Sequence, residues 1–258
     1  MKPWALALAL TLGLASGAQA APRIAIIIDD LGYSRRHGEA VLALPGAITC
    51  AVIPATPFAK RLGAGAARAG KEVMIHLPMA ALNARRLDHG AISEGMDRDQ
   101  IATVLDRARA ILPGARGINN HMGSALTAAP QPMRRLMAVL RQRHLYFVDS
   151  RTSAATVAER TARETGLAAG RRDIFLDNQR DPHRINSQFN KLLRLARQRG
   201  HAIAIGHPYP ETIDYLRQVL PLMEQTGVEL VPVSQLLAPV HGTSTAAKTA
   251  PAGEAVDG

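Results

Sequence analysis

The chain has little cysteine and few aromatic residues. Its one cysteine, Cys50, excludes an intrachain disulfide, and the apolar neighbours in Ile48–Ile53 predict a small buried residue rather than a catalytic thiol. Aromatic residues make up 3% of the sequence, and the one tryptophan, Trp4, lies near the N-terminus. This composition leaves little material for the sugar-stacking surface of a dedicated lectin.

Acidic residues are also outnumbered, which gives a formal net charge of +10. The basic residues are scattered along the expected helices rather than gathered in one block, which is typical of a solvated basic surface. Because the sequence has few aromatic residues and no recognisable nucleic-acid-binding motif, it predicts no nucleic-acid partner. Attraction to anionic polymers of the cell envelope is compatible with this charge.

Only the N-terminus carries a long apolar segment. Lys2 precedes an uncharged stretch rich in Ala and Leu, which ends at Ala18-Gln19-Ala20. This pattern predicts a cleaved secretory signal at 1–20 and therefore a periplasmic or secreted protein. An uncleaved anchor is the alternative, but the segment is shorter than the ~20 residues of a membrane span. No span is expected after cleavage.

The rest of the chain alternates between apolar runs and helical patterns. We expect one domain at 21–240 and, because 241–258 is rich in Ala, Thr and Gly without apolar periodicity, a disordered tail there. Strands are expected at 23–29, 48–53, 72–76, 116–119, 145–149, 173–176, 202–206 and 229–232. Helices are expected at about 35–43, 57–69, 97–111, 131–143, 154–168, 184–199 and 210–226. The alternation predicts a mostly parallel sheet with helices outside.

Polar residues follow several of these apolar runs. Asp29 and Asp30 end the first run, where two adjacent carboxylates repel each other and lose hydration, so a cation between them is the natural explanation. Three histidines end similar runs: His76, His121 and His207. Because the ends of parallel strands converge on one rim, these residues predict a metal site and favour a barrel over an open sheet.

Each of these residues also has a plain structural interpretation. The Asp29-Asp30 pair is compatible with a strand end followed by a helix cap, and His76 and His121 with hydrogen-bonded strand-end histidines. His207 precedes Pro208 and is compatible with a turn. The joint placement of these residues favours the metal site.

Further polar residues are candidates for contacts behind the site or with substrate. Asp149 and Arg151 lie two residues apart on one expected strand, so they either orient the base or a ligand or form a structural ion pair. Asn119, Asn120 and Ser124 suggest a polar pocket around His121. Asp177 is expected in a turn, at most as a substrate contact.

The order of short motifs resembles the divergent polysaccharide deacetylase family over about residues 23 to 238. The matching segments are Ile-Ile-Asp-Asp-Leu-Gly (27–32), His-Leu-Pro-Met (76–79), Asn-Asn-His-Met-Gly-Ser (119–124), Phe-Val-Asp-Ser-Arg-Thr (147–152), Phe-Leu-Asp-Asn (175–178) and Ile-Gly-His-Pro (205–208). The resemblance implies a distorted (β/α) barrel, here of about seven parallel strands with outer helices, related to metal-dependent carbohydrate N-deacetylases of bacterial envelopes.

The resemblance also implies roles for particular residues. In the better-known deacetylases the first aspartate of the pair is the general base, and the second binds a divalent metal beside two histidines. Asp29 and Asp30 match these two aspartates. His76 occupies the place of the first histidine ligand. The usual second histidine is absent, and His121 is the candidate replacement. His207 resembles the general acid, with a ligand role as the alternative.

Elementary chemistry is consistent with these roles. Zn²⁺ held by one carboxylate and two imidazoles keeps an open position for water, lowers the pKa of that water towards ~7 and polarises an amide carbonyl. Asp29 would then accept a proton and His207 would return one to the departing amine. The predicted cofactor is therefore a divalent metal, with Zn²⁺ preferred.

Three functions remain open at this point. The first is a metal-dependent hydrolase that removes N-acetyl groups from an envelope polysaccharide such as peptidoglycan. The second is a catalytically degenerate barrel that binds an envelope glycan or protein, because the second histidine and an Arg-x-Pro-Tyr signature are absent. The third is hydrolysis of an ester or peptide, since metal-activated water serves all of these bonds.

Overall fold

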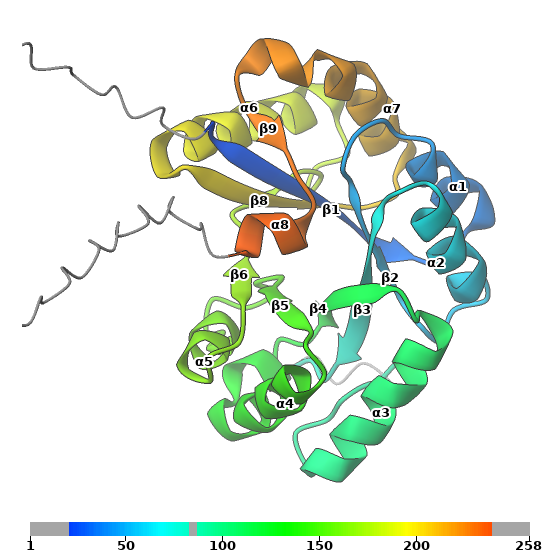
Figure 1. Ribbon diagram of the computed structural model, residues 1–258, viewed down its shortest axis with the longest axis vertical. Coiled ribbons are helices and arrows are strands. Elements are labelled where there is room, and N and C mark those ends of the chain that lie inside the picture. The colour runs from blue at the N-terminus through cyan, green and yellow to red at the C-terminus, as the bar shows by residue number, and fades with distance from the viewer. Residues whose placement is uncertain (1–20, 83–86, 239–258) are drawn as a thin grey trace, which may run out of the picture.

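Parallel strands follow one another around a barrel in the order of the sequence (Figure 1). The structure is a computed structural model that describes residues 21–82 and 87–238, so the predicted signal at 1–20 and the predicted tail at 241–258 lie outside the described residues. The strands within this part are β1 (Arg23–Leu31), β2 (Thr49–Val52), β3 (Glu72–Met79), β4 (Ala115–Met122), β5 (Tyr146–Asp149), β6 (Ala169–Arg171), β7 (Ile174–Phe175), β8 (His201–Gly206) and β9 (Glu229–Leu230).

The sheet runs in the order β6-β5-β4-β3-β2-β1-β8-β7, with β9 beside β1. Its two edge strands, β6 and β7, are joined by Arg172 and Asp173. The Arg172 N–H donates to the Asp149 carbonyl at 2.8 Å, and the Asp173 N–H donates to the Ile203 carbonyl at 2.9 Å. The chain itself therefore closes the barrel at this seam, and the predicted distorted (β/α) barrel is confirmed.

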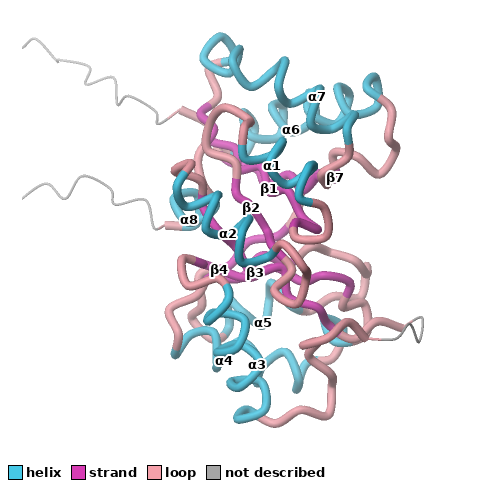
Figure 2. The backbone as a smooth tube through the Cα atoms, turned by 90° about the vertical axis from the view of Figure 1, so that its right-hand side faces the viewer, coloured by secondary structure: helices cyan, strands magenta, loops and turns pink. Residues whose placement is uncertain are grey.

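Helices surround the strands (Figures 1 and 2). They are α1 (Arg35–Leu42), α2 (Ala59–Arg68), α3 (Arg98–Ile111), α4 (Pro130–Gln142), α5 (Ala158–Glu164), α6 (Pro182–Arg199), α7 (Pro210–Val219) and α8 (Val233–Leu237), with 3-10 turns at Leu126–Ala128 and Leu220–Thr226. In Figure 2, α1, α6 and α7 lie on one side of the strands and α3, α4 and α5 on the other. None of the described helices has the length and apolar character that a membrane crossing requires.

Local sequence sets the ends of the clearest helix, α6. The Asp181 carboxylate accepts a hydrogen bond from the Arg184 N–H at 2.9 Å, and Pro182 occupies the first turn. Gly200 ends the helix with φ of 83°, a left-handed conformation that costs glycine little. These caps end the helix on both sides, so that the chain continues into the strands that flank it, β7 and β8.

Two apolar clusters lie on opposite faces of the sheet. Along β1, Ile24, Ile26 and Ile28 pack outward against the helices, while Ala25 and Ile27 face the barrel interior. The interior cluster also includes residues of α8, which covers the amino ends of the strands: Ser234 donates its backbone N–H to Glu72 at the start of β3. At the carboxyl ends, the side chains of Asp30 and His121 are partly exposed.

Several boundaries differ from the predicted ones. Strands β3 and β4 run on to Met79 and Met122, beyond the predicted ends at 76 and 119, because their pairing continues past the apolar runs. The predicted helix at 154–168 is shorter, since α5 covers only Ala158–Glu164 and is followed by β6. Neither β6 nor α8 was predicted, because each is too short to show a clear periodicity.

Candidate metal centre

Strand alternation brings the site residues to the interior of the barrel. Asp29 lies two residues after Ile27 on β1, and His76 lies two residues after Met74 on β3, so both share the face of the interior cluster. By the same alternation His207, two residues after Ile205 and just beyond the end of β8, lies on the interior side. Their side chains therefore meet above the apolar interior, at the open carboxyl end of the barrel.

Asp30 reaches the same side through an irregularity in β1. Adjacent residues of a regular strand face opposite sides, so Asp29 and Asp30 would not normally meet in one site. The register of β1 against β2 shifts between Ile28 and Leu31, and Asp30 has φ of 56°. This left-handed conformation is costly for a residue other than glycine and is typical of functional sites.

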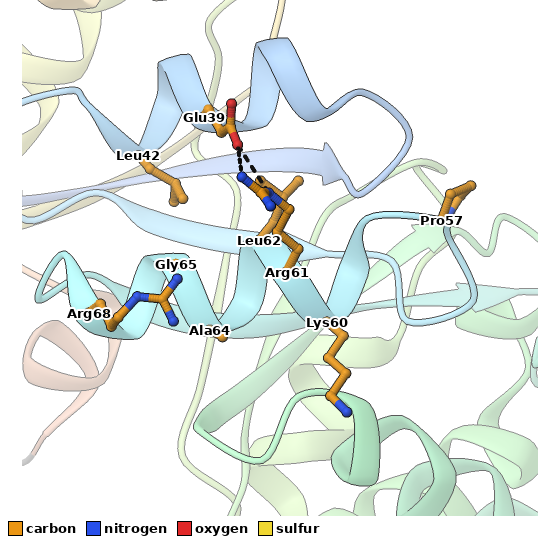
Figure 3. Close-up of a pocket in the computed structure, with 9 residues that line it drawn as sticks. All are labelled: Glu39, Leu42, Pro57, Lys60, Arg61, Leu62, Ala64, Gly65 and Arg68. Carbon is orange, nitrogen blue, oxygen red and sulfur yellow. Dashed lines mark hydrogen bonds and ion pairs between the residues drawn. The ribbon is translucent and has the colours of Figure 1, made fainter.

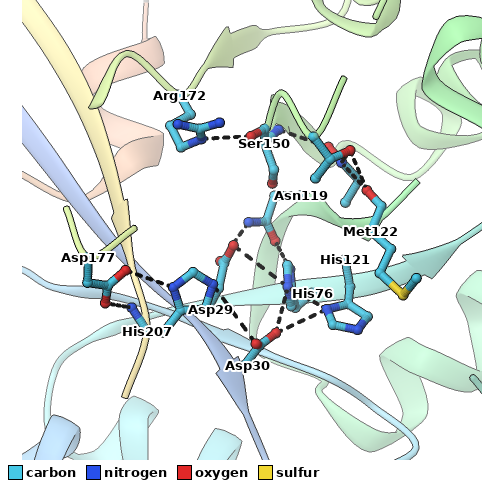
Figure 4. A network of polar contacts seen from close by, with 12 residues as sticks. Asp29, Asp30, His76, Asn119, His121, Met122, Ser150, Arg172, Asp177 and His207 are labelled. Carbon is cyan, nitrogen blue, oxygen red and sulfur yellow. Dashed lines mark hydrogen bonds and ion pairs between the residues drawn. The ribbon is translucent and has the colours of Figure 1, made fainter. Parts of the chain in front are cut away.

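Three potential ligand atoms form a nearly equilateral triangle (Figure 4). The Asp30 Oδ1 atom lies 3.2 Å from His76 Nε2 and 3.0 Å from His121 Nδ1. The two nitrogens are 3.1 Å apart. The structure thus brings together the three residues that the sequence predicts as metal ligands, within one potential coordination group.

The neighbour of His76 determines which of its nitrogens carries the proton. The Asn119 Nδ2 donates to Asp29 Oδ1 at 2.7 Å, because a carboxylate only accepts, and this orients the amide. The Asn119 Oδ1 therefore faces His76 Nδ1, at 2.8 Å, and accepts its hydrogen. In the neutral imidazole the lone pair is then on Nε2, the atom of the triangle.

His121 has a comparable arrangement. Its Nε2 lies 3.3 Å from the Asp88 carboxylate, on the side away from the triangle. A carboxylate behind a ligating imidazole orients the ring, and it leaves Nδ1 available as a ligand. Asp88 comes from the segment that follows β3, so His121 is held from outside its own strand.

The triangle fits a divalent metal such as Zn²⁺. Bond lengths of about 2.0–2.1 Å in a tetrahedral site separate neighbouring ligands by roughly 3.3 Å, close to the sides of this triangle. In addition, Asp30 Oδ1 is buried and has no hydrogen-bond donor of good geometry among the described residues. Asp30, His76 and His121 therefore have the ligand atoms and the spacing that such an ion would need.

The surroundings of Asp29 and Asp30 shift the pKa values of the two adjacent carboxylates in opposite directions. Burial raises the pKa of Asp29 and outweighs its attraction to His76 and His207. For Asp30 burial acts in the same direction, but the imidazoles of His121 and His76 beside its carboxylate outweigh burial and lower the pKa below the usual range. Asp30 is thus the ionised member and Asp29 the better proton acceptor, as expected where two carboxylates divide their roles.

His76 is basic in the absence of a metal. Burial lowers the pKa of this imidazole, but attraction to Asp29 and to Asp30 outweighs it and raises the pKa to about 9. The metal-free site therefore holds a proton where the metal would bind.

His207 and Asp177 form a second polar unit on the other side of Asp29. The Asp177 carboxylate accepts the His207 backbone N–H at 2.6 Å, bonds to its Nδ1 at 2.9 Å and accepts the Thr212 hydroxyl at 2.7 Å. Burial lowers the pKa of His207, but the hydrogen bond to Asp177 outweighs it and raises the pKa. Within the part of the chain that the structure describes, His207 Nε2 has no hydrogen bond and lies 3.9 Å from Asp30 Oδ2.

Asp177 and the Asp149–Arg151 pair correct the sequence analysis. Asp177 is a fully buried partner of His207 rather than a turn residue. Strand β5 ends at Asp149, so Arg151 does not share a strand face with it, and Asp149 accepts the Arg151 backbone N–H instead of its guanidinium. Among the described residues the pair forms no ion pair, and neither side chain has a hydrogen bond to Asp29 or to a predicted metal ligand.

Asn120 and Ser124, two residues of the polar pocket predicted around His121, have other partners in the structure. Asn120 faces away from the metal ligands and binds the Ser150 N–H at 2.8 Å and the Met122 carbonyl at 2.8 Å. The Ser124 hydroxyl accepts the Leu82 N–H at 3.0 Å. These residues hold neighbouring loops in place instead of lining the site.

Asn119 was predicted only as part of a polar pocket, not as a bridge between Asp29 and His76, and Asp88 was not predicted at all. For Asn119 a signal existed, since it lies two residues before His121 and hence on the same face of β4. No pattern marked Asp88. Cys50 is buried as predicted, and burial raises the pKa of its thiol to about 12, so it stays protonated.

A surface hollow elsewhere has different chemistry. It has a volume of about 620 Å³ and lies between α1 and α2, where Glu39 and Arg61 form an ion pair of 2.8 Å (Figure 3). None of the predicted site residues lines it. The open end of the barrel remains the candidate site.

Comparisons with known proteins agree with this fold. The sequence model of the divergent polysaccharide deacetylase family matches residues 26–237. The chain is 41% identical, over 95% of its own length and 76% of the relative's, to the uncharacterized protein YibQ of Escherichia coli K12.

Two solved structures share the architecture. An uncharacterized protein from Agrobacterium tumefaciens C58 has a TM-score of 0.79 at 23% identity, covering 86% of this chain and 91% of that one. A mutant of a CE4 family pseudoenzyme with restored enzymatic activity has a TM-score of 0.50 at 13% identity, covering 85% of this chain and 68% of that one. At these identities the likeness concerns the fold alone.

Proposed function

The chain belongs to the divergent polysaccharide deacetylase family, and we propose that it is a metal-dependent hydrolase that removes N-acetyl groups from a glycan of the cell envelope. The observation that carries the proposal is the triangle of Asp30, His76 and His121 beside the buried Asp29. The predicted secretory signal supports an envelope location, where peptidoglycan is an abundant acetylated glycan.

Asp30, His76 and His121 would hold the metal. A divalent ion such as Zn²⁺ supplies polarisation of an amide carbonyl and acidification of water at such a site. The chain supplies the remaining functions. Asn119 and Asp88 fix the two imidazole rings, so that the ligand nitrogens stay directed at one point.

Asp29 accepts the proton of the attacking water. Its Oδ1 is held by Asn119, which leaves Oδ2 free to take the proton, and Oδ2 lies 3.7 Å from His76 Nε2, close to the triangle. Burial makes Asp29 a better base than an exposed aspartate, because it disfavours the charged carboxylate.

His207 supplies a proton to the departing amine. Asp177 binds its Nδ1, which leaves Nε2 as the position from which the proton is donated. The same carboxylate favours the protonated imidazole, so the acid is charged when it is needed. Asp29 and His207 thus act from neighbouring strands, β1 and β8, on one substrate amide.

Metal analysis and an assay on acetylated glycan fragments test the proposal together. We expect one divalent ion per chain in protein loaded with zinc, and release of acetate that falls at least 10²-fold in Asp29→Asn and His121→Ala. His183→Ala is the matched control, because His183 is exposed on α6. No bound metal after zinc addition, or equal background in all four proteins, would overturn the proposal and favour a degenerate binding barrel.

A further inference from the structure

Arg172 occupies the seam of the barrel beside the candidate site (Figure 4). It is half-buried, and its Nε and Nη2 donate to the Ser150 carbonyl at 2.7 Å and the Arg151 carbonyl at 3.0 Å. Its guanidinium also lies over the Phe175 ring, 4.8 Å from the centroid. These contacts fix the group in place.

The charge of Arg172 is not neutralised by contact. Within residues 21–82 and 87–238, no carboxylate forms an ion pair with it, and its Nη1 has no hydrogen-bond partner. Burial lowers the pKa of Arg172 and repulsion by Arg151 lowers it further, whereas Asp29 and Asp149 attract it from a distance. A fixed, partly dehydrated cation with a free nitrogen is a suitable anion-binding group.

Two more arginines lie on this side of the site. Arg151 is exposed, and its carbonyl is one of the acceptors that hold Arg172. The Arg180 guanidinium lies 3.5 Å from the centroid of the Tyr209 ring, and that ring stacks on His207 at 5.5 Å. The seam and the surroundings of His207 are therefore basic.

The opposite side of the site is acidic. Asp88 contacts His121 there, and burial and then the charges of Asp88 and Asp30 raise the pKa of Tyr33. In Figure 4, Arg172 and His121 lie at opposite sides of the network. A substrate with an anionic group would thus be attracted at the seam and repelled near Asp88.

We propose that Arg172, assisted by Arg151 and Arg180, binds an anionic group of the glycan, a carboxylate or phosphate borne by the sugar that enters the site or by its neighbour. This inference rests on the proposed function and narrows its substrate to acidic glycans. A planar guanidinium binds either anion with paired hydrogen bonds, so one site serves both. Neutral polymers of N-acetylglucosamine would bind more weakly.

Binding of matched neutral and anionic fragments tests the inference by calorimetry on the zinc-loaded chain. The carboxylate arm uses an N-acetylglucosamine–N-acetylmuramic acid disaccharide and its methyl ester, and the phosphate arm uses N-acetylglucosamine 6-phosphate and the free sugar. We expect an affinity about tenfold higher for at least one anion than for its neutral counterpart, since a charge-assisted hydrogen bond at a half-exposed site has roughly this value.

Variants assign this preference to residues. Arg172→Gln should reduce it to less than about threefold, and Arg151→Gln with Arg180→Gln should reduce it partly, whereas Arg194→Gln on the exposed face of α6 should keep it. If Arg172→Gln does not fold, the double variant decides, because it retains the Arg172 contacts. Equal affinity for anions and neutral counterparts in the wild type, or an unchanged preference in the variants, would overturn the inference.

The outcome is separate from that of the proposed function, because the affinity for each fragment and the release of acetate are two different measurements. A preference for the anion without acetate release would uphold the anion site and contradict the hydrolase. Acetate release together with equal affinity for each anion and its neutral counterpart would uphold the hydrolase and contradict the anion site.

Discussion

At the scale of single residues, one amide links the base to a metal ligand. Asn119 is fully buried and bonds to both Asp29 and His76, from a strand that is 90 positions away from Asp29 in sequence. Because its donor and acceptor ends are not interchangeable, it fixes the carboxylate and the imidazole tautomer together. Asn119 thus restrains the side chains of Asp29 and His76 in one arrangement.

Removal of this amide should weaken the metal site. In Asn119→Ala, Asp29 and His76 lose a buried partner, so we expect zinc affinity to fall by roughly 10–100-fold. Competition with a chromophoric chelator measures the change. Asn190→Ala, on the exposed surface of α6, serves as the control. Equal zinc affinity in Asn119→Ala and wild type would show that the bridge has no part in metal binding.

The pKa of His76 predicts the pH dependence of metal binding. The metal needs the neutral imidazole, but His76 stays protonated up to about pH 9 in the metal-free site. Zinc affinity should therefore rise with pH, by up to about tenfold per unit from this group, and level off near pH 9. Calorimetry between pH 6.5 and 8.5 should also detect the released proton through the buffer. A constant affinity over this range would contradict the assignment.

The same shift predicts the opposite trend for the stability of the metal-free protein. A pKa raised to about 9 from 6.5 means that the folded state holds the proton more tightly than the unfolded chain. This contribution is complete below pH 6.5 and is lost as the pH rises through about 9. Urea unfolding of chelator-treated protein should show this loss, which should be absent in His76→Gln.

At the scale of elements, close approach of strands limits which residues fit. Gly117 of β4 pairs with Tyr146 of β5, and a Cβ at Gly117 would lie 2.2 Å from the Tyr146 ring. The ring cannot yield freely, because the Tyr146 hydroxyl donates to Glu72 at 2.7 Å. The interior of the barrel is thus filled at this level by one aromatic side chain against one glycine.

Gly117→Ala should destabilise the barrel by about 1–3 kcal/mol, the usual range for overpacking a core. Gly114→Ala is the matched control, because no atom lies within 4 Å of the position of its Cβ. Urea unfolding measures both changes. Similar stability of the two variants would mean that β4 and β5 separate at little cost.

The sequence shows the elements more reliably than their ends. Apolar runs such as Ile24–Ile28 predict strands because a parallel strand buried on both faces contains few polar residues. The extension of β4 through Asn120 and His121 to Met122 is not visible in this way, since polar side chains interrupt the apolar pattern. Functional residues therefore conceal the strand ends on which they lie.

At the scale of the whole molecule, the barrel is closed by two residues instead of by strand pairing. Asp173 bonds to Ile203 of β8 twice, through its N–H at 2.9 Å and through its carboxylate, which accepts the Ile203 N–H at 2.9 Å. Arg172 donates its backbone N–H to the Asp149 carbonyl of β5, on the other side of the seam. The closure of the fold and the proposed anion site thus share one segment.

Loss of the Asp173 carboxylate should loosen the seam. Asp173→Ala leaves the Ile203 N–H without its acceptor, so we expect a loss of about 1–3 kcal/mol in the free energy of unfolding. Hydrogen exchange should accelerate in β7 and β8 before the rest of the barrel. Asp214→Ala, at an exposed position of α7, is the control. Uniform exchange in Asp173→Ala would contradict a local role for this contact.

The sequence by itself determined the alternation of strands and helices and the residues that end the strands. Periodicity of two assigns a face to Asp29, His76, His121 and His207, and parallel strands bring their carboxyl ends to one rim. These relations are local or follow from the class of fold. They are therefore readable without coordinates.

Only the tertiary structure decided how these groups face one another. The shift in β1 and the left-handed Asp30 bring two adjacent carboxylates to one side, and the bridge through Asn119 depends on strand register. Closure of the barrel brings Arg172 beside the site. Such contacts join segments far apart in the chain, and their distances depend on register, irregularities and closure, which no local pattern encodes.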